Sequence, residues 1–188
     1  MSNAIIVHGC CGKEEFFGDE YPSLSNSHWI PWLQKDLMKA GIETQTPEMP
    51  TPYAPQYGDW VRVFEQFTLT PETIVVGYSC GAGFLLRWLS EHPVLVKKFL
   101  LVAPWLDLHK TRGSFLDFHI DSTVQHRIEE IHVLVSADDS KEGIHESVAT
   151  ISATLQQAHL HRFERMGHFT SRDMKTDQFP ELLKLIVP

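Results

Sequence analysis

Short apolar segments typical of β-strands alternate with longer helical patterns along the chain, and this alternation restricts the possible folds most strongly. Six segments are expected to form strands: 5–7, 42–46, 73–76, 99–102, 131–136 and 160–163. Helical patterns lie at 29–40, 59–67, 80–91 and 141–158, with a weaker one around Val124 and Ile128 and a last helix that Asp177 caps. Strands that helices connect and cover on both faces form a parallel sheet. The sequence therefore predicts an α/β, doubly wound fold of about six mostly parallel strands with helices on both faces.

The composition is typical of a single globular domain, here residues 1–188. The formal net charge is −8 and no run of Lys or Arg is present, so nucleic acid is not an expected partner. The longest apolar run, 99–106, is shorter than the roughly 18 residues of a membrane helix, and residues 1–7 lack the cationic start of a secretion signal. We expect a cytoplasmic protein without membrane contact, and the sequence does not determine its oligomeric state.

The cysteines are Cys10, Cys11 and Cys80, and because their number is odd and two of them are adjacent, no disulfide framework can be read from the sequence. A reducing cytoplasm is the simplest location for a protein without such a framework. His8 lies close to Cys10 and Cys11 in the sequence, but a structural zinc site needs a second pair of ligands that this segment lacks. No metal is therefore expected. No cofactor is expected either, because the catalytic groups described below are self-sufficient.

A Gly-x-Ser-x-Gly pattern connects a predicted strand to a predicted helix, and it reads Gly77-Tyr78-Ser79-Cys80-Gly81. This context is the one that a nucleophile elbow requires, because a sharp strand-to-helix turn lifts the serine hydroxyl clear of the sheet. The alternative is an ordinary strand–helix turn in which the serine only caps the helix. The pattern favours Ser79 as a catalytic nucleophile.

A serine nucleophile needs a base, and the base needs an acid that orients it. In a doubly wound sheet these groups follow the carboxyl ends of the strands. His168 follows the last predicted strand, and Asp138 and Asp139 follow the strand before it. Asp139 is the expected acid, with Asp138 and Asp107 as alternatives. The chain order of serine, acid and histidine is that of the α/β-hydrolase arrangement.

Two backbone N–H groups are expected to stabilise the oxyanion of an acyl-transfer reaction. One belongs to Cys80, directly after the nucleophile, and the other to Cys10 in the loop after the first strand, with Cys11 as the second choice for that loop. The cysteine side chains are incidental to this role. Three aromatic residues near the same end of the sheet are expected to contact the substrate, and they are Tyr78, Trp105 and Phe169. The sequence does not determine whether segment 104–127 covers the pocket.

These segments resemble the small serine hydrolases typified by retinoblastoma-binding protein 9 and its bacterial relatives. The resemblance covers essentially the whole chain, and its motifs are Trp29-Ile30-Pro31-Trp32-Leu33, Gly77-Tyr78-Ser79-Cys80-Gly81, Leu101-Val102-Ala103, Asp138-Asp139 and Gly167-His168-Phe169. It implies an α/β-hydrolase without a large lid, with a triad of Ser79, Asp139 and His168. The chain departs from the family pattern in having Tyr78 where a histidine is common, and Ser140 where a proline commonly follows the acid.

The expected function is hydrolysis of a small acyl compound, of the carboxylesterase kind, through an acyl-enzyme. One alternative is a binding or regulatory module that keeps the fold without catalysis. Another is cleavage of a thioester, an amide or a C–C bond by the same triad. The natural substrate and its acyl length are not determined by the sequence.

Overall fold

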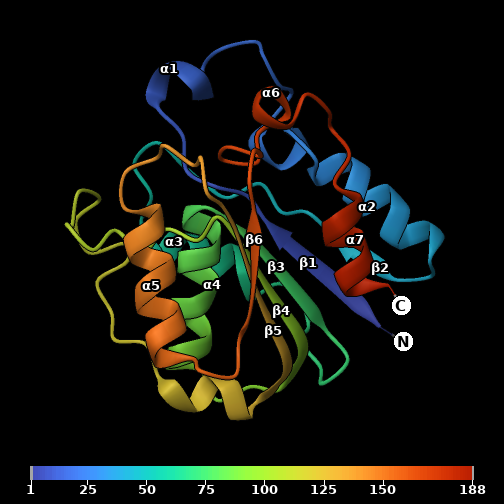
Figure 1. The fold of residues 1–188 in the computed structure, drawn as a ribbon, viewed down its shortest axis with the longest axis vertical. Coiled ribbons are helices and arrows are strands. Elements are labelled where there is room, and N and C mark those ends of the chain that lie inside the picture. The colour runs from blue at the N-terminus through green and yellow to red at the C-terminus, as the bar shows by residue number, and fades with distance from the viewer. Residues whose placement is uncertain (1, 188) are drawn as a thin grey trace.

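The computed structural model describes residues 2–187, which contain a six-stranded sheet whose paired strands all run parallel (Figure 1). The strands are β1 (Asn3–Val7), β2 (Glu43–Gln45), β3 (Ile74–Tyr78), β4 (Val96–Val102), β5 (Ile128–Ser136) and β6 (His159–Phe163). Their order across the sheet is β2-β1-β3-β4-β5-β6. The predicted doubly wound fold is therefore confirmed. Met1 and Pro188, the ends of the predicted domain 1–188, lie outside the described residues.

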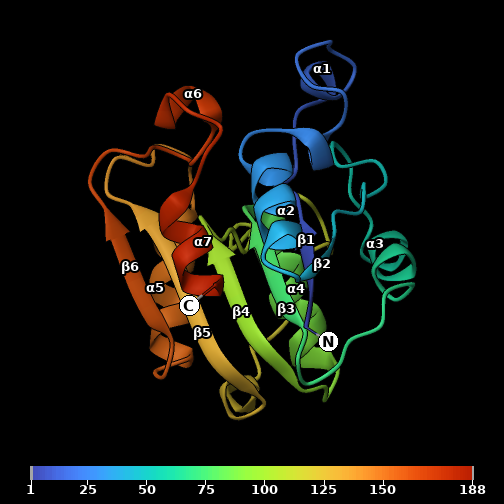
Figure 2. The same ribbon diagram turned by 90° about the vertical axis from the view of Figure 1, so that its right-hand side faces the viewer.

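Helices cover both faces of this sheet (Figure 2). The helices are α1 (Lys13–Phe16), α2 (Ile30–Lys39), α3 (Tyr57–Phe64), α4 (Cys80–Glu91), α5 (Ile144–Thr154), α6 (Ser171–Met174) and α7 (Pro180–Ile186), with 3-10 turns η1 (Leu24–Asn26) and η2 (Ser122–His126). Helices α3, α4 and α5 lie on one face and α2 and α7 on the other, while α1 and α6 lie beyond the carboxyl ends of the strands (Figure 1). None of the described helices is both long and apolar enough to cross a membrane.

The two faces of the sheet carry two separate hydrophobic layers. Along β3, Val75 packs into the layer under α3, α4 and α5, while Ile74 and Val76 pack into the layer under α2 and α7. This alternation follows from the strand geometry, in which successive side chains point to opposite faces. All three side chains are buried. An uninterrupted apolar run is what a strand buried on both faces requires.

The chain changes direction across the sheet between β1 and β3. From β1 it crosses to β2 on one side, and it then returns past β1 to β3 and continues to β6. The ends of β1 and β3 are neighbours, because Val7 pairs with Gly77. Connections that leave such neighbouring strands toward opposite sides open a crevice at their carboxyl ends, where ligands bind in open α/β sheets.

Several predicted boundaries were wrong. The weak helical pattern near Val124 and Ile128 is a 3-10 turn followed by β5, which already begins at Ile128. The last helix begins at Pro180 with Phe179, not Asp177, at the capping position. The helix expected over 141–158 covers Ile144–Thr154 only, and its later start follows from Gly143, which precedes it in a left-handed conformation with a φ of 81°. Helices α1 and α6 were not predicted, since four residues are too few to show a helical period.

Candidate active site

Ser79 lies in the turn between β3 and α4. Its φ of 53° and ψ of −122° are unusual for a residue with a side chain. The turn is held on both sides, since the Ser79 N–H donates to the Val102 carbonyl at 2.9 Å and the Ser79 carbonyl accepts from the Trp105 N–H at 3.1 Å. The strained backbone therefore projects the hydroxyl from the carboxyl end of the sheet, as a nucleophile elbow requires.

The glycines that flank this turn allow unusually close backbone packing. A Cβ atom at Gly77 would lie 2.7 Å from the Ala82 nitrogen. A Cβ atom at Gly81 would overlap the His8 carbonyl oxygen and lie 2.6 Å from that of Val7. Helix α4 therefore begins in direct contact with the end of β1, which brings Ser79 next to the loop after β1.

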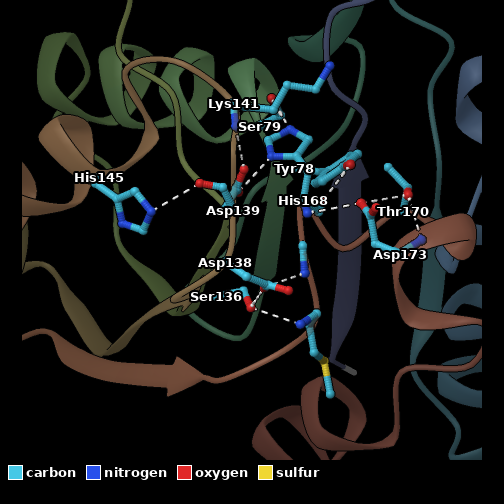
Figure 3. Close-up of polar contacts among 12 residues, drawn as sticks. Tyr78, Ser79, Ser136, Asp138, Asp139, Lys141, His145, His168, Thr170 and Asp173 are labelled. Atoms are coloured by element: carbon cyan, nitrogen blue, oxygen red, sulfur yellow. Dashed lines mark hydrogen bonds and ion pairs between the residues drawn. The ribbon is translucent and has the colours of Figure 1, made fainter.

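His168 connects Ser79 to Asp139 (Figure 3). Its Nε2 lies 3.0 Å from the Ser79 Oγ, and its Nδ1 lies 2.8 Å from the Asp139 Oδ2. A carboxylate can only accept, so Nδ1 carries the hydrogen and Nε2 is free to accept from the serine hydroxyl. The Asp139 side chain is fully buried, and that of His168 is 11% exposed. The structure thus brings together the three residues that sequence reasoning selected from distant segments.

Asp138 has a different role from its neighbour. One of its carboxylate oxygens accepts from the Ser136 hydroxyl at 2.6 Å and from the Gly167 N–H at 2.9 Å. The hydrogen bond from Ser136, followed in effect by that from Gly167, holds the pKa of Asp138 below its usual value. Figure 3 shows this carboxylate turned toward Ser136. Asp138 is therefore not the partner of the imidazole, and it ties the loop after β5 to the loop after β6 instead.

Asp107, the other alternative acid, is committed elsewhere. It is buried and accepts from the backbone N–H groups of Thr111 at 2.7 Å and Arg112 at 2.6 Å. It makes no hydrogen bond to His168. Its carboxylate closes a turn in the segment after β4.

Further hydrogen bonds hold the backbone on both sides of the imidazole. The Tyr78 hydroxyl donates to the His168 carbonyl at 2.7 Å, and the His168 N–H donates to an Asp173 carboxylate oxygen at 3.0 Å. Asp173 is fixed in turn by the Thr170 hydroxyl at 2.8 Å, which forms a capping pair at the start of α6. Sequence reasoning missed Asp173, although a Thr-x-x-Asp spacing is a recognisable capping signal. Burial raises the pKa of Tyr78 well above its usual value, so this hydroxyl stays protonated as a donor.

The loop after β1 is oriented by His8. The Met49 N–H donates to the His8 Nε2 at 2.8 Å, so Nδ1 carries the hydrogen and donates to the Gly9 carbonyl at 2.7 Å. Burial lowers the pKa of His8 despite the nearby Glu48 carboxylate, which keeps the ring neutral. The Gly9 carbonyl and the Cys10 N–H belong to one planar peptide. His8 therefore sets the direction of the Cys10 amide.

Cys10 and Cys80 are joined by a disulfide bond, with their Cα atoms 5.7 Å apart. The prediction that the cysteines define no disulfide framework was wrong. The two residues are 70 positions apart, and only the adjacency of β1 and β3 brings them together. Cys11 is the remaining free, buried thiol. The bond also removes the basis on which a reducing compartment was expected.

Comparisons with known proteins show the family of this chain. The sequence pattern of the family described as Serine hydrolase matches residues 20–187. The YdeN protein of Bacillus subtilis (strain 168), which is named as a hydrolase, is 31% identical over 169 residues, covering 84% of this chain and 86% of that protein. The chain belongs to the serine hydrolase family.

Solved structures resemble this serine hydrolase in fold. The crystal structure of the B. subtilis ydeN gene product has a TM-score of 0.82 at 23% identity, covering 99% of this chain and 97% of that one. A member of the α/β serine hydrolases without a lid, from Xanthomonas campestris, has a TM-score of 0.60 at 18% identity, covering 98% and 78%. At these identities the likeness concerns the fold alone, which is that of the α/β hydrolases.

The pocket of this serine hydrolase has a volume of about 290 Å³ and opens over Ser79 and His168. Of the aromatic residues expected to contact a substrate, Tyr78 and Trp105 line it. Phe169 lies instead in the core, fully buried, with its ring 5.2 Å from that of Phe179. Its place beside His168 in the sequence did not reveal this, because a φ of 56° turns its side chain away from the direction that an ordinary loop would give.

Several pocket residues were not found by sequence reasoning, because no local pattern marks them. The charged ones are Glu15, Arg112, Lys141 and Glu142. Segment 104–127 thus contributes Trp105 and Arg112 to the walls. His28 also lines the pocket, and burial lowers its pKa to about 4, so it is neutral near pH 7. Within residues 2–187, no group of three or more His, Cys, Asp or Glu side chains is placed to hold a metal ion.

Proposed function

We propose that this serine hydrolase cleaves esters of small acyl groups through an acyl-enzyme formed on Ser79. The observation that carries the proposal is the hydrogen-bonded path from the buried Asp139 through His168 to the Ser79 hydroxyl, at the floor of an open pocket. A hydroxyl is a weak nucleophile at neutral pH unless an adjacent base takes its proton. This path supplies such a base together with the acid that orients it.

In the proposed reaction the Ser79 oxygen attacks the ester carbonyl while the His168 Nε2 takes the hydroxyl proton. Asp139 accepts a hydrogen bond from Nδ1 and stabilises the imidazolium that forms. The Cys10 and Cys80 N–H groups stabilise the oxyanion, and neither donates to another group in the described part of the chain. His168 then protonates the leaving alcohol. Water, activated by the same imidazole, releases the acid and regenerates the serine.

The pocket favours a short acyl group. Its volume of about 290 Å³ lies at the lower end of the roughly 300–1,000 Å³ of small-molecule sites. Trp105, Leu24 and Ile144 supply apolar wall, and the charged side chains lie among them.

Within the serine hydrolases we also propose membership of the group typified by retinoblastoma-binding protein 9. Location in the cytoplasm stays a prediction.

Labelling with a fluorophosphonate probe tests the nucleophile directly. The unaltered protein should be labelled and should hydrolyse p-nitrophenyl acetate and butyrate, and Ser79→Ala should lose both properties. Ser122→Ala is the matched control, because Ser122 is exposed and lies in η2, away from the pocket. Labelling that survives in Ser79→Ala would refute the assignment.

Assays of the unaltered protein distinguish the remaining alternatives. Ester hydrolysis no faster than in buffer, together with an absence of labelling, would favour a binding module on this fold. Thioester, amide and C–C substrates of matched acyl length belong in the same panel. If the kcat/KM for one of these substrates exceeds that for the ester, the proposed triad stands but the enzyme catalyses a different class of reaction.

A further inference from the structure

The two residues proposed to supply the oxyanion amides are the same two that the disulfide joins. Cys10 lies in the loop after β1, and Cys80 is the first residue of α4. The two amides must therefore keep a fixed separation during acyl transfer, although they belong to segments 70 positions apart. A disulfide between the side chains of these same residues restricts the separation of the two amides directly.

Without this bond the loop after β1 has few strong attachments. The Cys11 N–H reaches the Pro52 carbonyl only at 3.5 Å, and an Arg112 nitrogen reaches the Cys11 carbonyl only at 3.4 Å. Both distances lie beyond the usual range of N–H···O bonds. The hydrogen bond from His8 to the Gly9 carbonyl orients the peptide but does not reach α4. The disulfide is thus a direct covalent link between the loop and the helix that follows Ser79, in addition to their packing contacts.

We propose that the Cys10–Cys80 disulfide positions the two oxyanion amides relative to each other, so that its reversible reduction lowers the turnover of the enzyme. Both cysteines are positioning residues in this scheme, since their sulfurs do not touch the reacting atoms. The proposal rests on the proposed function, because it concerns the rate of that reaction.

The bond can be reached from the pocket, which both cysteines line. Cys10 is half-buried and Cys80 is fully buried, so a small thiol meets the Cys10 sulfur first. A thiolate of a small dithiol attacks this sulfur, the S–S bond breaks, and Cys80 leaves as a thiolate that takes up a proton. The second thiol of the reagent then displaces Cys10 as a thiol. The protein gains two electrons and two protons, and the dithiol becomes a cyclic disulfide.

The neighbouring thiol of Cys11 does not take over the bond. Burial, more than the nearby Glu15 carboxylate, raises its pKa to about 11, so the nucleophilic thiolate is scarce at neutral pH. Exchange between Cys11 and the disulfide is correspondingly slow. The protein should therefore switch between two defined states, with Cys10 and Cys80 either bonded or both reduced.

The test compares kcat and KM for p-nitrophenyl butyrate in the oxidised and reduced protein. Thiol titration after denaturation should find Cys11 alone before treatment with dithiothreitol and all three cysteines after it. We expect kcat to fall by about 10- to 100-fold on reduction, less than the roughly 10²–10³-fold lost with an entire oxyanion donor. KM should change little, and oxidation with the cyclic disulfide of the reagent should restore kcat.

Two variants control this comparison. Cys11→Ser keeps the disulfide, so its kcat should fall on reduction by the same factor as in the unaltered protein, whatever its basal rate. The double variant Cys10→Ser/Cys80→Ser should have the kcat of the reduced protein and be insensitive to dithiol. If dithiothreitol does not reduce the bond, this variant still tests the proposal, because it lacks the bond altogether. Circular dichroism should show that all forms are folded.

The outcomes are distinct from those that test the proposed function. The proposal is wrong if the purified protein titrates with three free thiols, or if kcat is the same in the oxidised, reduced and double-variant forms. If neither oxidation state is labelled by fluorophosphonate or turns over the ester, the proposed function fails instead. Labelling of Ser79 in both states, slower after reduction, supports the positioning role.

Discussion

The two halves of the proposed active site are built in different ways. The nucleophile half comprises Ser79, the glycines around it and the loop 8–12 after β1. The base half comprises the loops after β5 and β6, which carry Asp139 and His168. In the first half, backbone segments touch one another directly. In the second, side-chain hydrogen bonds hold two longer loops in place.

Close contacts define the nucleophile half. Besides the overlap that a side chain at Gly81 would cause, a Cβ atom at Gly9 would lie 3.1 Å from the Ser79 Cβ. No side chain can be added at such positions without moving the backbone. The disulfide from Cys10 to Cys80 crosses the same region. Because sterics and covalent chemistry fix this half, a substitution here should disturb folding or the relative placement of the two segments.

The base half depends on polar groups. Asp138 holds Gly167, Tyr78 holds the carbonyl of His168, and Asp173 holds its N–H. Each hydrogen bond contributes only on the order of 1 kcal/mol. Removing one should let the imidazole shift without unfolding the protein. The comparison thus predicts losses of stability or displaced segments in the nucleophile half, and losses of rate without unfolding in the base half.

The largest effect is expected from Asp139→Asn in the base half. The amide would present an N–H group to the imidazole and favour the wrong tautomer, so kcat for p-nitrophenyl butyrate should fall by about 10⁴-fold while the fold is kept. Asp138→Asn is the matched control, because an amide oxygen can still accept from Gly167. Its kcat should stay within about 10-fold of the unaltered value. An equal loss in the two variants would contradict the separate roles of these neighbours.

The next effect belongs to the nucleophile half. In Gly81→Ala the added methyl group would overlap the His8 carbonyl oxygen, so the free energy of unfolding in urea should fall by about 3 kcal/mol or more. Gly58→Ala is the control, because nothing lies within 4 Å of its Cβ position and alanine is favoured in a helix such as α3. It should leave stability unchanged or raise it by up to about 1 kcal/mol. If Gly81→Ala had the same free energy of unfolding as the unaltered protein, this half would not be sterically fixed.

Tyr78→Phe should have a smaller effect. It leaves the His168 carbonyl without its donor, so kcat should fall by about 5- to 10-fold, which corresponds to the roughly 1 kcal/mol of one hydrogen bond. KM should change little, because the ring that lines the pocket remains. Tyr57→Phe removes a hydroxyl that bonds Glu91, away from the pocket, and should leave kcat unaltered. A change in KM alone would identify Tyr78 as a substrate contact instead.

The smallest expected effect is a pH dependence of stability that arises from histidines on β5 and β6. His132 and His161 contact each other at 3.0 Å between ring nitrogens, beside Glu130, Lys98 and the stacked ring of His159. Burial lowers the pKa of both His132 and His161 from the usual 6.5. The unfolded chain therefore binds more protons than the folded one just below pH 6.5, and stability should fall as pH decreases through this window.

Urea unfolding at pH 8 and pH 5 measures this dependence. In His161→Gln the decrease in stability toward pH 5 should be smaller than in the unaltered protein. His8 and His28, whose pKa values burial also lowers, are present in both proteins and cancel in the comparison. An unchanged pH dependence would show that the histidines on β5 and β6 do not contribute to it.

Much of the fold and of the site geometry could be predicted because it depends on short-range patterns. The strand Ile74–Tyr78, the turn at Ser79 and the helix that follows are specified by an apolar run, two glycines and a helical period. Parallel strands carry their carboxyl ends to one edge, so the position of His168 after the last strand was enough to select it. Asp139 was favoured over Asp138, but their different hydrogen bonds depend on how the loops after β5 and β6 meet.

Other features required distances between remote segments. No pattern around Cys10 or Cys80 indicates that they pair, since the decisive fact is that β1 and β3 are neighbours. Nothing around Phe169 indicates that its ring enters the core, because its contact with Phe179 joins the loop after β6 to the start of α7. Periodicity and turn chemistry are local and can be read along the chain. Pairing, burial and the walls of a pocket arise only when the sheet brings distant residues together.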